Sequence, residues 1–268
     1  MKTFSTSILA CCGALLLGTT TVFAQGSNPL DPTVQKSKVL VGPVIGGTRN
    51  MHSGGFRTID EPNCPIFTSG SGWGILGGVT AEFQFGETWS IIPRVTYQTR
   101  PGSFTQTLPD ALVLLPGQQN PVNQSVTTSS EITYELLTTE VMFKQEFAEL
   151  GPVRLGVAAG PSFSYVIGGN NYQIQDLIDP PNARFVNPTG LPTDNNGRRL
   201  IRYDDAIPGR ESIRFSFKGG LQGEFGLFNN AWLMSPGIYY DYGITDVTAA
   251  ENWQLSSIMF QIDFRRAF

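Results

Sequence analysis

The chain ends with Ile258-Met259-Phe260-Gln261-Ile262-Asp263-Phe264-Arg265-Arg266-Ala267-Phe268, in which apolar and polar side chains alternate. Successive side chains of a β-strand point to opposite faces. One face of this segment would carry Ile258, Phe260, Ile262, Phe264 and Phe268, and the other would carry Ser257, Met259, Gln261, Asp263 and Arg265. Because the first face suits lipid and the second a polar interior, the pattern predicts a strand in the wall of a transmembrane β-barrel.

The same alternation recurs in three other windows, 79–85, 91–98 and 213–225. No run of about 18 apolar residues follows position 25, so a membrane would have to be crossed by strands. The alternative is a periplasmic or secreted β-sandwich. That interpretation requires Phe215, Phe217, Phe260 and Phe264 to form a buried core.

The spacing of the strands separates these two interpretations. Eight candidate strands lie at about 38–48, 73–86, 88–100, 131–147, 152–166, 212–226, 231–244 and 254–268. Short turns at 85–88, 148–151 and 227–230 alternate with longer connections at 49–72, 101–130, 167–211 and 245–253. Bacterial outer-membrane barrels show this pattern, with tight periplasmic turns and long extracellular loops.

A sheet edge left open in hydrocarbon is costly because its unpaired backbone groups find no water there. We therefore expect the first strand to pair with the eighth. The sequence predicts an all-β fold, an eight-stranded antiparallel up-and-down transmembrane β-barrel over residues 38–268, in the outer membrane of a Gram-negative bacterium. Both termini are expected in the periplasm, and the barrel is expected to be a monomer surrounded by outer-membrane lipid and lipopolysaccharide.

The first 24 residues have the features of a secretory signal peptide. Lys2 provides the positive start, residues 8–17 the apolar run, and Val22-Phe23-Ala24 the small-residue cleavage site. Residues 25–37 would then form a periplasmic N-terminal segment.

Charge and cysteine content exclude two classes of protein. The formal net charge of −4 is spread along the chain rather than gathered in blocks, so no nucleic-acid partner is expected. Cys64 is the only cysteine beyond the signal segment, which excludes an intrachain disulfide framework in the exported part. It is interpreted as a free surface thiol or a partner in an intermolecular disulfide.

Tryptophans and prolines mark the predicted strands. Four tryptophans lie at predicted strand ends, as expected for interfacial girdles: Trp73, Trp89, Trp232 and Trp253. Four prolines fall inside odd-numbered strands, on the predicted outward face: Pro43, Pro93, Pro161 and Pro236. Because proline cannot donate to the ladder, we expect a local bulge at each.

The predicted inward face carries charges of both signs. The interior of an eight-stranded barrel is just wide enough to be filled by side chains, so these groups are expected to pair in a plugged lumen. A narrow path for ions or solutes is the alternative. Inward Gly156, Gly160, Gly220 and Gly237 would make room for longer neighbours. The charged set is Glu82, Arg94, Glu140, Lys144, Arg154, Arg214, Lys218, Glu224, Asp241, Asp263 and Arg265.

Residues suited to catalysis are scarce, and no catalytic, cofactor-binding or metal-binding residue is assigned. His52 is the only histidine, so a Ser–His–acid triad would have to be built around it in the first long loop, where an ordinary loop histidine is preferred. Asn170, Asn171, Asp204 and Asp205 in the third long loop bear oxygen ligands suited to calcium. They lack the spacing of a calcium-binding loop, so a solvated polar loop is expected.

Four segments and the last residue carry a resemblance to a known family: Gly77-Gly78-Val79-Thr80-Ala81-Glu82-Phe83, Trp89-Ser90-Ile91-Ile92-Pro93-Arg94-Val95-Thr96-Tyr97, Leu155-Gly156-Val157-Ala158-Ala159-Gly160-Pro161-Ser162, Ile238-Tyr239-Tyr240-Asp241-Tyr242-Gly243-Ile244-Thr245-Asp246, and Phe268. They are similar to the PorT-like outer-membrane β-barrel proteins of Bacteroidetes and related bacteria. The resemblance implies an eight-stranded barrel whose C-terminal strand, ending in Phe268, is recognised by the barrel-assembly machinery.

The favoured function is structural or interactive and not enzymatic. The long loops of the barrel would contact envelope or extracellular protein partners. The alternatives are a narrow channel, a secretion-accessory barrel of the kind that the resemblance suggests, and a lipid-modifying enzyme that uses His52.

Overall fold

The computed structural model describes residues 39–59, 64–115, 117–186, 190–228 and 232–267. The predicted signal peptide 1–24, the segment 25–37 and Phe268 lie outside these ranges. Among the described residues, no helix is long and apolar enough to cross a membrane. Eight strands form a closed ring: β1 (Val39–Phe56), β2 (Phe67–Gln84), β3 (Trp89–Leu114), β4 (Val122–Leu150), β5 (Val153–Leu177), β9 (Ile213–Leu227), β10 (Trp232–Gly243) and β11 (Asn252–Ala267).

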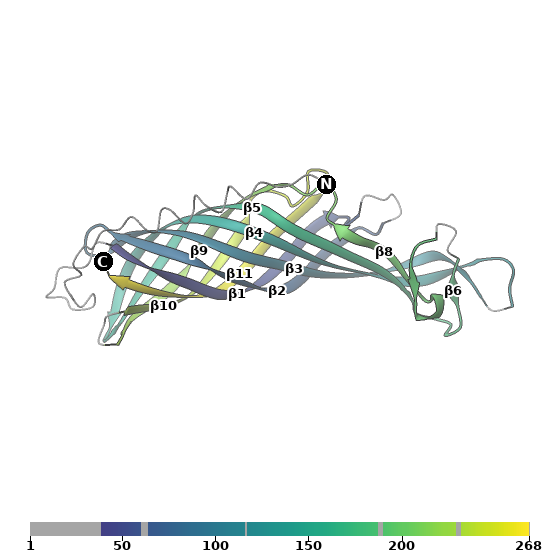
Figure 1. Ribbon diagram of the computed structural model, residues 1–268, viewed down its shortest axis with the longest axis horizontal. Helices are drawn as coiled ribbons and strands as arrows, with labels where there is room; N and C mark the ends of the chain where they lie inside the picture. The colour runs from purple at the N-terminus through teal and green to yellow at the C-terminus, as the bar shows by residue number, and fades with distance from the viewer. Residues whose placement is uncertain (1–38, 60–63, 116, 187–189, 229–231, 268) are drawn as a thin grey trace, which may run out of the picture.

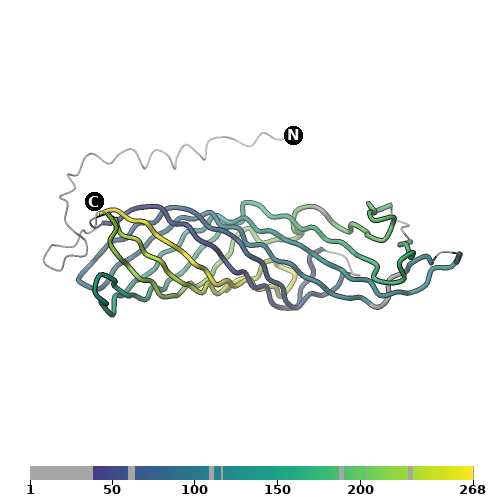
Figure 2. The backbone as a smooth tube through the Cα atoms, turned by 90° about the horizontal axis from the view of Figure 1, so that it is seen from below, coloured from purple at the N-terminus to yellow at the C-terminus, as the bar shows by residue number. Residues whose placement is uncertain are grey.

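Every strand of the ring pairs antiparallel with its neighbours, and β1 pairs with β11 to close it. The closing ladder runs from Leu40 opposite Ala267 to Gly55 opposite Asn252. Figures 1 and 2 show the resulting tilted barrel, with the C-terminus at one end. The predicted fold class and the predicted closure are both confirmed.

The alternation of side chains sorts the two faces as the sequence predicts. In β11, Met259, Gln261, Asp263 and Arg265 are buried inside the ring. On the outer face, Phe215, Phe217 and Phe260 are about half exposed, at 49%, 51% and 45%. These phenylalanines form no core, which rules out the β-sandwich.

The strands are longer than predicted, and the second predicted loop is wrong. Most of residues 101–130 continue β3 and β4, which stay paired as far as Val113 opposite Val122. Here the outward residues are hydroxylic, such as Thr105 and Thr127, so the polar/apolar alternation that revealed the other strands is absent. The backbone ladder nevertheless continues because threonine suits a pleated surface.

The third predicted loop is also largely ordered into secondary structure. It contains the end of β5 followed by β6 (Arg184–Phe185), β7 (Thr193–Asp194), the 3-10 turn η1 (Asn195–Gly197) and β8 (Arg199–Ala206). β8 pairs with β5 from Asn170 onward, above the point where β9 pairs with β5 at Tyr165.

We call residues 104–114 of β3, 122–135 of β4 and 170–177 of β5, together with β6, β7 and β8, the projecting sheet. It extends well beyond the ring, at the end opposite the C-terminus (Figure 1). A small apolar core at its far end contains Val113, Val126, Leu177 and Ala183.

The predicted bulges at the four prolines are wrong. The register with both neighbours is the same on either side of Pro43, Pro93, Pro161 and Pro236. In each case the ladder to one neighbour skips the proline, while the ladder to the other neighbour is continuous. One lost donor is therefore tolerated without inserting a residue.

The prediction of a tryptophan girdle is confirmed for only some of the four tryptophans. Trp89 and Trp232 are the first residues of β3 and β10. Trp73 is exposed but lies inside β2, which begins at Phe67. Trp253 is fully buried and points into the ring, so the prediction for this residue is wrong.

Closure can be tested with paired cysteines. Ile45 and Ile262 lie opposite each other on β1 and β11, within the span of a disulfide, whereas Ile258 is four residues further along β11, roughly 13 Å away at the rise of a strand. We expect Ile45→Cys/Ile262→Cys to form an intramolecular disulfide on mild oxidation, seen as a gel-mobility shift that reductant reverses. Ile45→Cys/Ile258→Cys is the control, and equal cross-linking of both pairs would contradict this register.

Candidate functional site: the lumen and its outer seal

The charges inside the ring form three linked clusters, and the first has Glu224 on β9 at its centre. Its Oε1 accepts hydrogen bonds from Lys144 Nζ at 2.6 Å and Arg265 Nη2 at 2.5 Å. Lys144 also contacts Glu82 at 2.7 Å, and Arg265 contacts the other oxygen of Glu82. These four residues are at most 1% exposed, so each charge depends on its partners rather than on water.

The second cluster crosses the middle of the lumen. Arg94 on β3 donates to Asp263 on β11 at 2.6 Å, and Lys218 on β9 donates to Glu140 on β4 at 2.8 Å. Both cations lie over the ring of Tyr239, with Arg94 Cζ at 5.3 Å and Lys218 Nζ at 4.9 Å from its centroid. Cation–π attraction thus adds to the ion pairs.

The third cluster lies nearer the projecting sheet. Asp241 Oδ2 is 2.8 Å from Arg100 Nη2 and 3.2 Å from Arg214 Nη2. Arg100 also donates to Ser257 and, at 2.6 Å, to Gln98. All eleven charges predicted to face inward are buried, and those of the three clusters are paired as expected.

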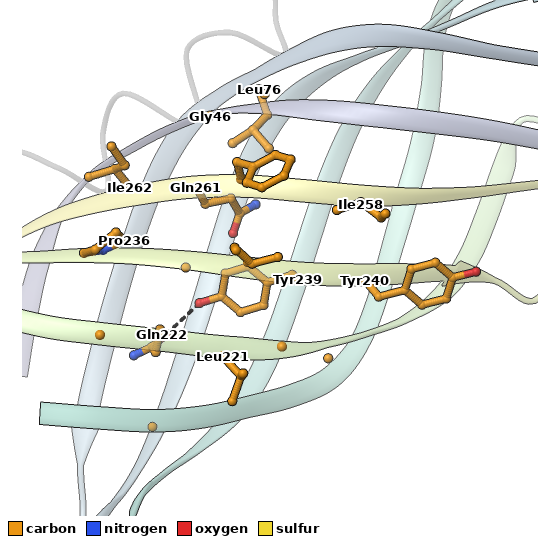
Figure 3. Close-up of a pocket in the computed structure, with 18 of the residues that line it drawn as sticks. Gly46, Leu76, Leu221, Gln222, Pro236, Tyr239, Tyr240, Ile258, Gln261 and Ile262 are labelled. Atoms are coloured by element: carbon orange, nitrogen blue, oxygen red, sulfur yellow. Dashed lines mark hydrogen bonds between the residues drawn. The ribbon is translucent and has the colours of Figure 1, made fainter. Parts of the chain in front are cut away.

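Tyr239 fits the lumen because glycines surround it. A Cβ on Gly237 would lie 2.6 Å from Tyr239 Cε2, and one on Gly220 would collide with the same side chain and with Ile238. The Tyr239 hydroxyl donates to Gln222 at 2.7 Å (Figure 3). The prediction that inward glycines make room for longer neighbours is confirmed at these two positions.

Aromatic side chains fill the lumen where it joins the projecting sheet, and Phe104 and Tyr134 come from the part of that sheet next to the ring. Trp253 stacks on Phe56 with centroids 4.3 Å apart and contacts Phe104 edge-on at 5.9 Å. Its indole N–H donates to His52 Nδ1 at 3.1 Å. We call this set the aromatic plug; its buried members are His52, Phe56, Phe67, Phe104, Tyr134 and Trp253.

A polar layer lies directly beyond the aromatic plug. Ser130 donates to Asn171 at 2.8 Å, and Thr58 donates to Gln173 at 2.8 Å. The Cys64 thiol lies 3.7 Å from the side-chain Oε1 of Gln173, and Cys64 is 6% exposed. Burial raises the pKa of this thiol above its usual value, which keeps it in the protonated, unreactive form.

Three predictions about single residues are corrected by this packing. His52 is not a loop residue, since it is buried on β1 within the aromatic plug. Cys64 is not a surface thiol. Asn171 is buried in β5 rather than solvated in a loop, and the described residues contain no group of three or more His, Cys, Asp and Glu side chains placed to hold a metal ion.

Sequence reasoning missed Arg100 and the role of Trp253. Arg100 is the last residue of the predicted strand 88–100, and its even number places it on the same face as Arg94. Extending the alternation of β3 by one more residue would have found it. Trp253 carried no such signal, because a tryptophan at the end of a strand can belong either to an interfacial girdle or to the lumen.

A ring of eight antiparallel strands with an apolar outer face and a charged interior filled by side chains defines a transmembrane β-barrel. The chain belongs to the outer membrane protein beta-barrel domain family, whose model matches residues 23–249. The family places the protein in the outer membrane.

Solved structures with a similar fold include three outer-membrane proteins. Neisserial surface protein A is 13% identical with a TM-score of 0.37, over 87% of this chain and 98% of its own. OprG from Pseudomonas aeruginosa is 10% identical with a TM-score of 0.38, over 87% and 97%. The Escherichia coli outer membrane protease OmpT is 6% identical with a TM-score of 0.34, over 86% and 96%. No sequence among curated proteins matches the chain.

Removing the charge of Glu224 should destabilise the barrel strongly. Glu224→Gln leaves Lys144 and Arg265 short of a buried counter-charge, and breaking such a pair costs roughly 3–5 kcal/mol in the free energy of unfolding. Urea unfolding of the detergent-folded protein, followed by gel mobility without boiling, measures the loss.

Two further variants control this experiment. Glu131→Gln removes an exposed carboxylate of the projecting sheet and should change the free energy of unfolding by less than about 0.5 kcal/mol. Adding Lys144→Gln to Glu224→Gln should recover part of the loss. Similar losses for Glu224→Gln and Glu131→Gln would show that the lumen charges do not depend on pairing.

Proposed function

We propose that this protein is a non-conducting, non-enzymatic outer-membrane barrel that holds the projecting sheet outside the cell, where it contacts envelope or extracellular partners. The observation that carries this proposal is the contrast between the two parts of the molecule. The lumen is filled, whereas the projecting sheet extends far beyond the ring.

The proposed orientation places both termini in the periplasm. Leu40 pairs with Ala267, so the described ends of the chain lie together, at the end of the ring that also carries the short turns between β2 and β3 and between β4 and β5. Short turns on the periplasmic side and long extensions outside are the usual arrangement in bacterial barrels. The projecting sheet is then extracellular.

The edges of the projecting sheet are poorly suited to recruiting another strand. On β3, the segment beyond Ser103 contains Pro109, which has no backbone N–H, and the register with β4 shifts between Leu108 and Ala111. The β8 edge carries charged Arg202 and Asp205. Proline, bulges and charge are common protections of an edge strand, so we assign recognition to the faces of the sheet.

The outward face of the projecting sheet is rich in hydroxyl groups. Thr105 lies opposite Ser129, and Thr107 lies opposite Thr127. Exposed apolar side chains lie at its far end, namely Leu112 at 58% and Ile178, which directly follows β5, at 52%. This combination of hydrogen-bonding groups and apolar anchors suits a polar protein surface or the sugars of lipopolysaccharide.

We also propose that the protein acts as a monomer and that its last strand is recognised by the barrel-assembly machinery. The resemblance to PorT-like barrels suggests an accessory role in secretion as the second candidate. Enzymatic use of His52 is disfavoured by its burial beside Trp253 and Phe104.

Photo-cross-linking in intact cells tests the surface role. A photoreactive amino acid at Leu112 should give macromolecular adducts, because this side chain is exposed in the projecting sheet. The same label at Phe143, 52% exposed on the lipid-facing wall of β4, should give only lipid adducts. Adducts of lipid size alone at both positions would refute the proposal.

Conductance measurements test the rival channel. With three ion-pair clusters and the aromatic plug in the lumen, the protein in a planar bilayer should show no resolvable current. Trp253→Ala removes the largest buried side chain of the plug and serves as the variant in which leak should appear first. Steady unitary currents from the wild type would favour the channel instead.

A further inference from the structure

The outer wall of the barrel carries an apolar hollow of about 1200 Å³, formed mainly across β5, β9, β10, β11 and β1 and also lined by Leu76 of β2 and Phe147 of β4 (Figure 3). It opens outward, because Ile45, Leu221 and Ile238 at its margin are 55%, 60% and 56% exposed. The side chains that line it include no charged residue. In an outer-membrane barrel, this wall faces hydrocarbon.

Inward glycines of the same wall are required by the fold. A Cβ on Gly46 would collide with the carbonyl oxygen of Phe260, and Gly220 and Gly237 leave space for Tyr239. Gly46, Gln261, Gly237, Gln222 and Gly156 are successive partners across the five strands, so glycine alternates with glutamine around the inner face. Glycine is therefore required at these inward positions by the packing of the barrel itself.

No steric constraint of this kind requires glycine at the outward positions that line the hollow. A Cβ on Gly47, Gly219 or Gly223 would meet its nearest atoms at 3.7 Å, which is ordinary van der Waals contact. None of the three has a positive φ. Glycine inside a strand weakens it and often marks the close approach of a ligand or of another backbone. The missing side chains at these positions create the hollow.

We propose that the hollow holds an acyl chain of a phospholipid. An apolar recess that faces hydrocarbon needs a flexible apolar occupant, and the surrounding lipid supplies one. The recess extends from the middle of the wall to its short-turn end, since its lining includes mid-strand Ile238 and also Phe147 and Leu155, which lie near the turn between β4 and β5. Given the orientation proposed above, on which this choice rests, that end is in the periplasmic leaflet, which contains phospholipid.

A second copy of the chain fits the hollow less well. A two-fold dimer places the same surface patch of each subunit against the other. Two concave patches would leave an empty space between them, which forfeits the packing that drives association in lipid.

Native mass spectrometry of the protein transferred from phosphatidylethanolamine vesicles into mild detergent tests the proposal. Gly219→Ile fills the hollow with a side chain that suits a strand, and Gly47→Val does the same from β1. Gly77→Ile is the matched control: Gly77 is also an outward glycine with an unobstructed Cβ position, but it does not line the hollow. All variants are first checked for the gel-mobility shift on boiling that a folded barrel gives.

The wild type and Gly77→Ile should retain one phospholipid. Gly219→Ile and Gly47→Val should retain it about tenfold less, equivalent to weakening the affinity by about 1.4 kcal/mol. Equal retention by all four proteins would overturn the proposal, and so would a wild-type dimer that Gly219→Ile abolishes. In vesicles that also contain lipopolysaccharide, preferential retention of lipopolysaccharide would overturn the choice of phospholipid. Conductance and cross-linking at Leu112 should be the same in all variants, so failure here is distinguishable from failure of the proposed function.

Discussion

The ladder between β1 and β11 sets the register on which the rest of the barrel depends. With Gly46 opposite Gln261, the inward rows of β11 bring Asp263 to Arg94 and Arg265 to Glu82. A slip of one residue would turn these side chains into hydrocarbon and the phenylalanines of β11 into the lumen. The charged interior and the apolar exterior therefore enforce the same alignment from opposite sides of the wall.

Two kinds of side chain fill the lumen at different positions along its axis. Ion pairs occupy the part near the termini, where long cationic side chains of β3, β4 and β9 reach carboxylates on strands two or three positions away around the ring. Stacked and edge-on aromatic rings occupy the part next to the projecting sheet. Because the charges are covered by the aromatic plug, they are held in a region of low dielectric, where a pair is strong and an unpaired group is costly. The plug and the ion pairs thus reinforce each other.

The membrane-spanning part was readable from the sequence because lipid imposes a strict alternation, as at 258–265 and 213–225. The projecting sheet was not readable, because residues 127–130 bear hydroxyl groups on both faces and residues 103–107 contain a single apolar side chain, Phe104, so neither segment shows a clear alternation of apolar and polar residues. The lumen charges could be assigned to a face but not to partners, since Arg94 and Asp263 meet only after the ring has closed. His52 is predicted in a loop for a different reason: the glycines and polar residues around it hide the alternation of its strand.

The cross-lumen pairs make closure of the ring an electrostatic event as well as a pairing of strands. Glu82 on β2 and Arg94 on β3 have Arg265 and Asp263 of β11, the last strand of the ring along the chain, as partners. Without β11 in place, these two charges lack those counter-ions, and a charge without a partner is costly away from water. Docking of β11 therefore completes the wall and supplies counter-charges to the lumen in the same step.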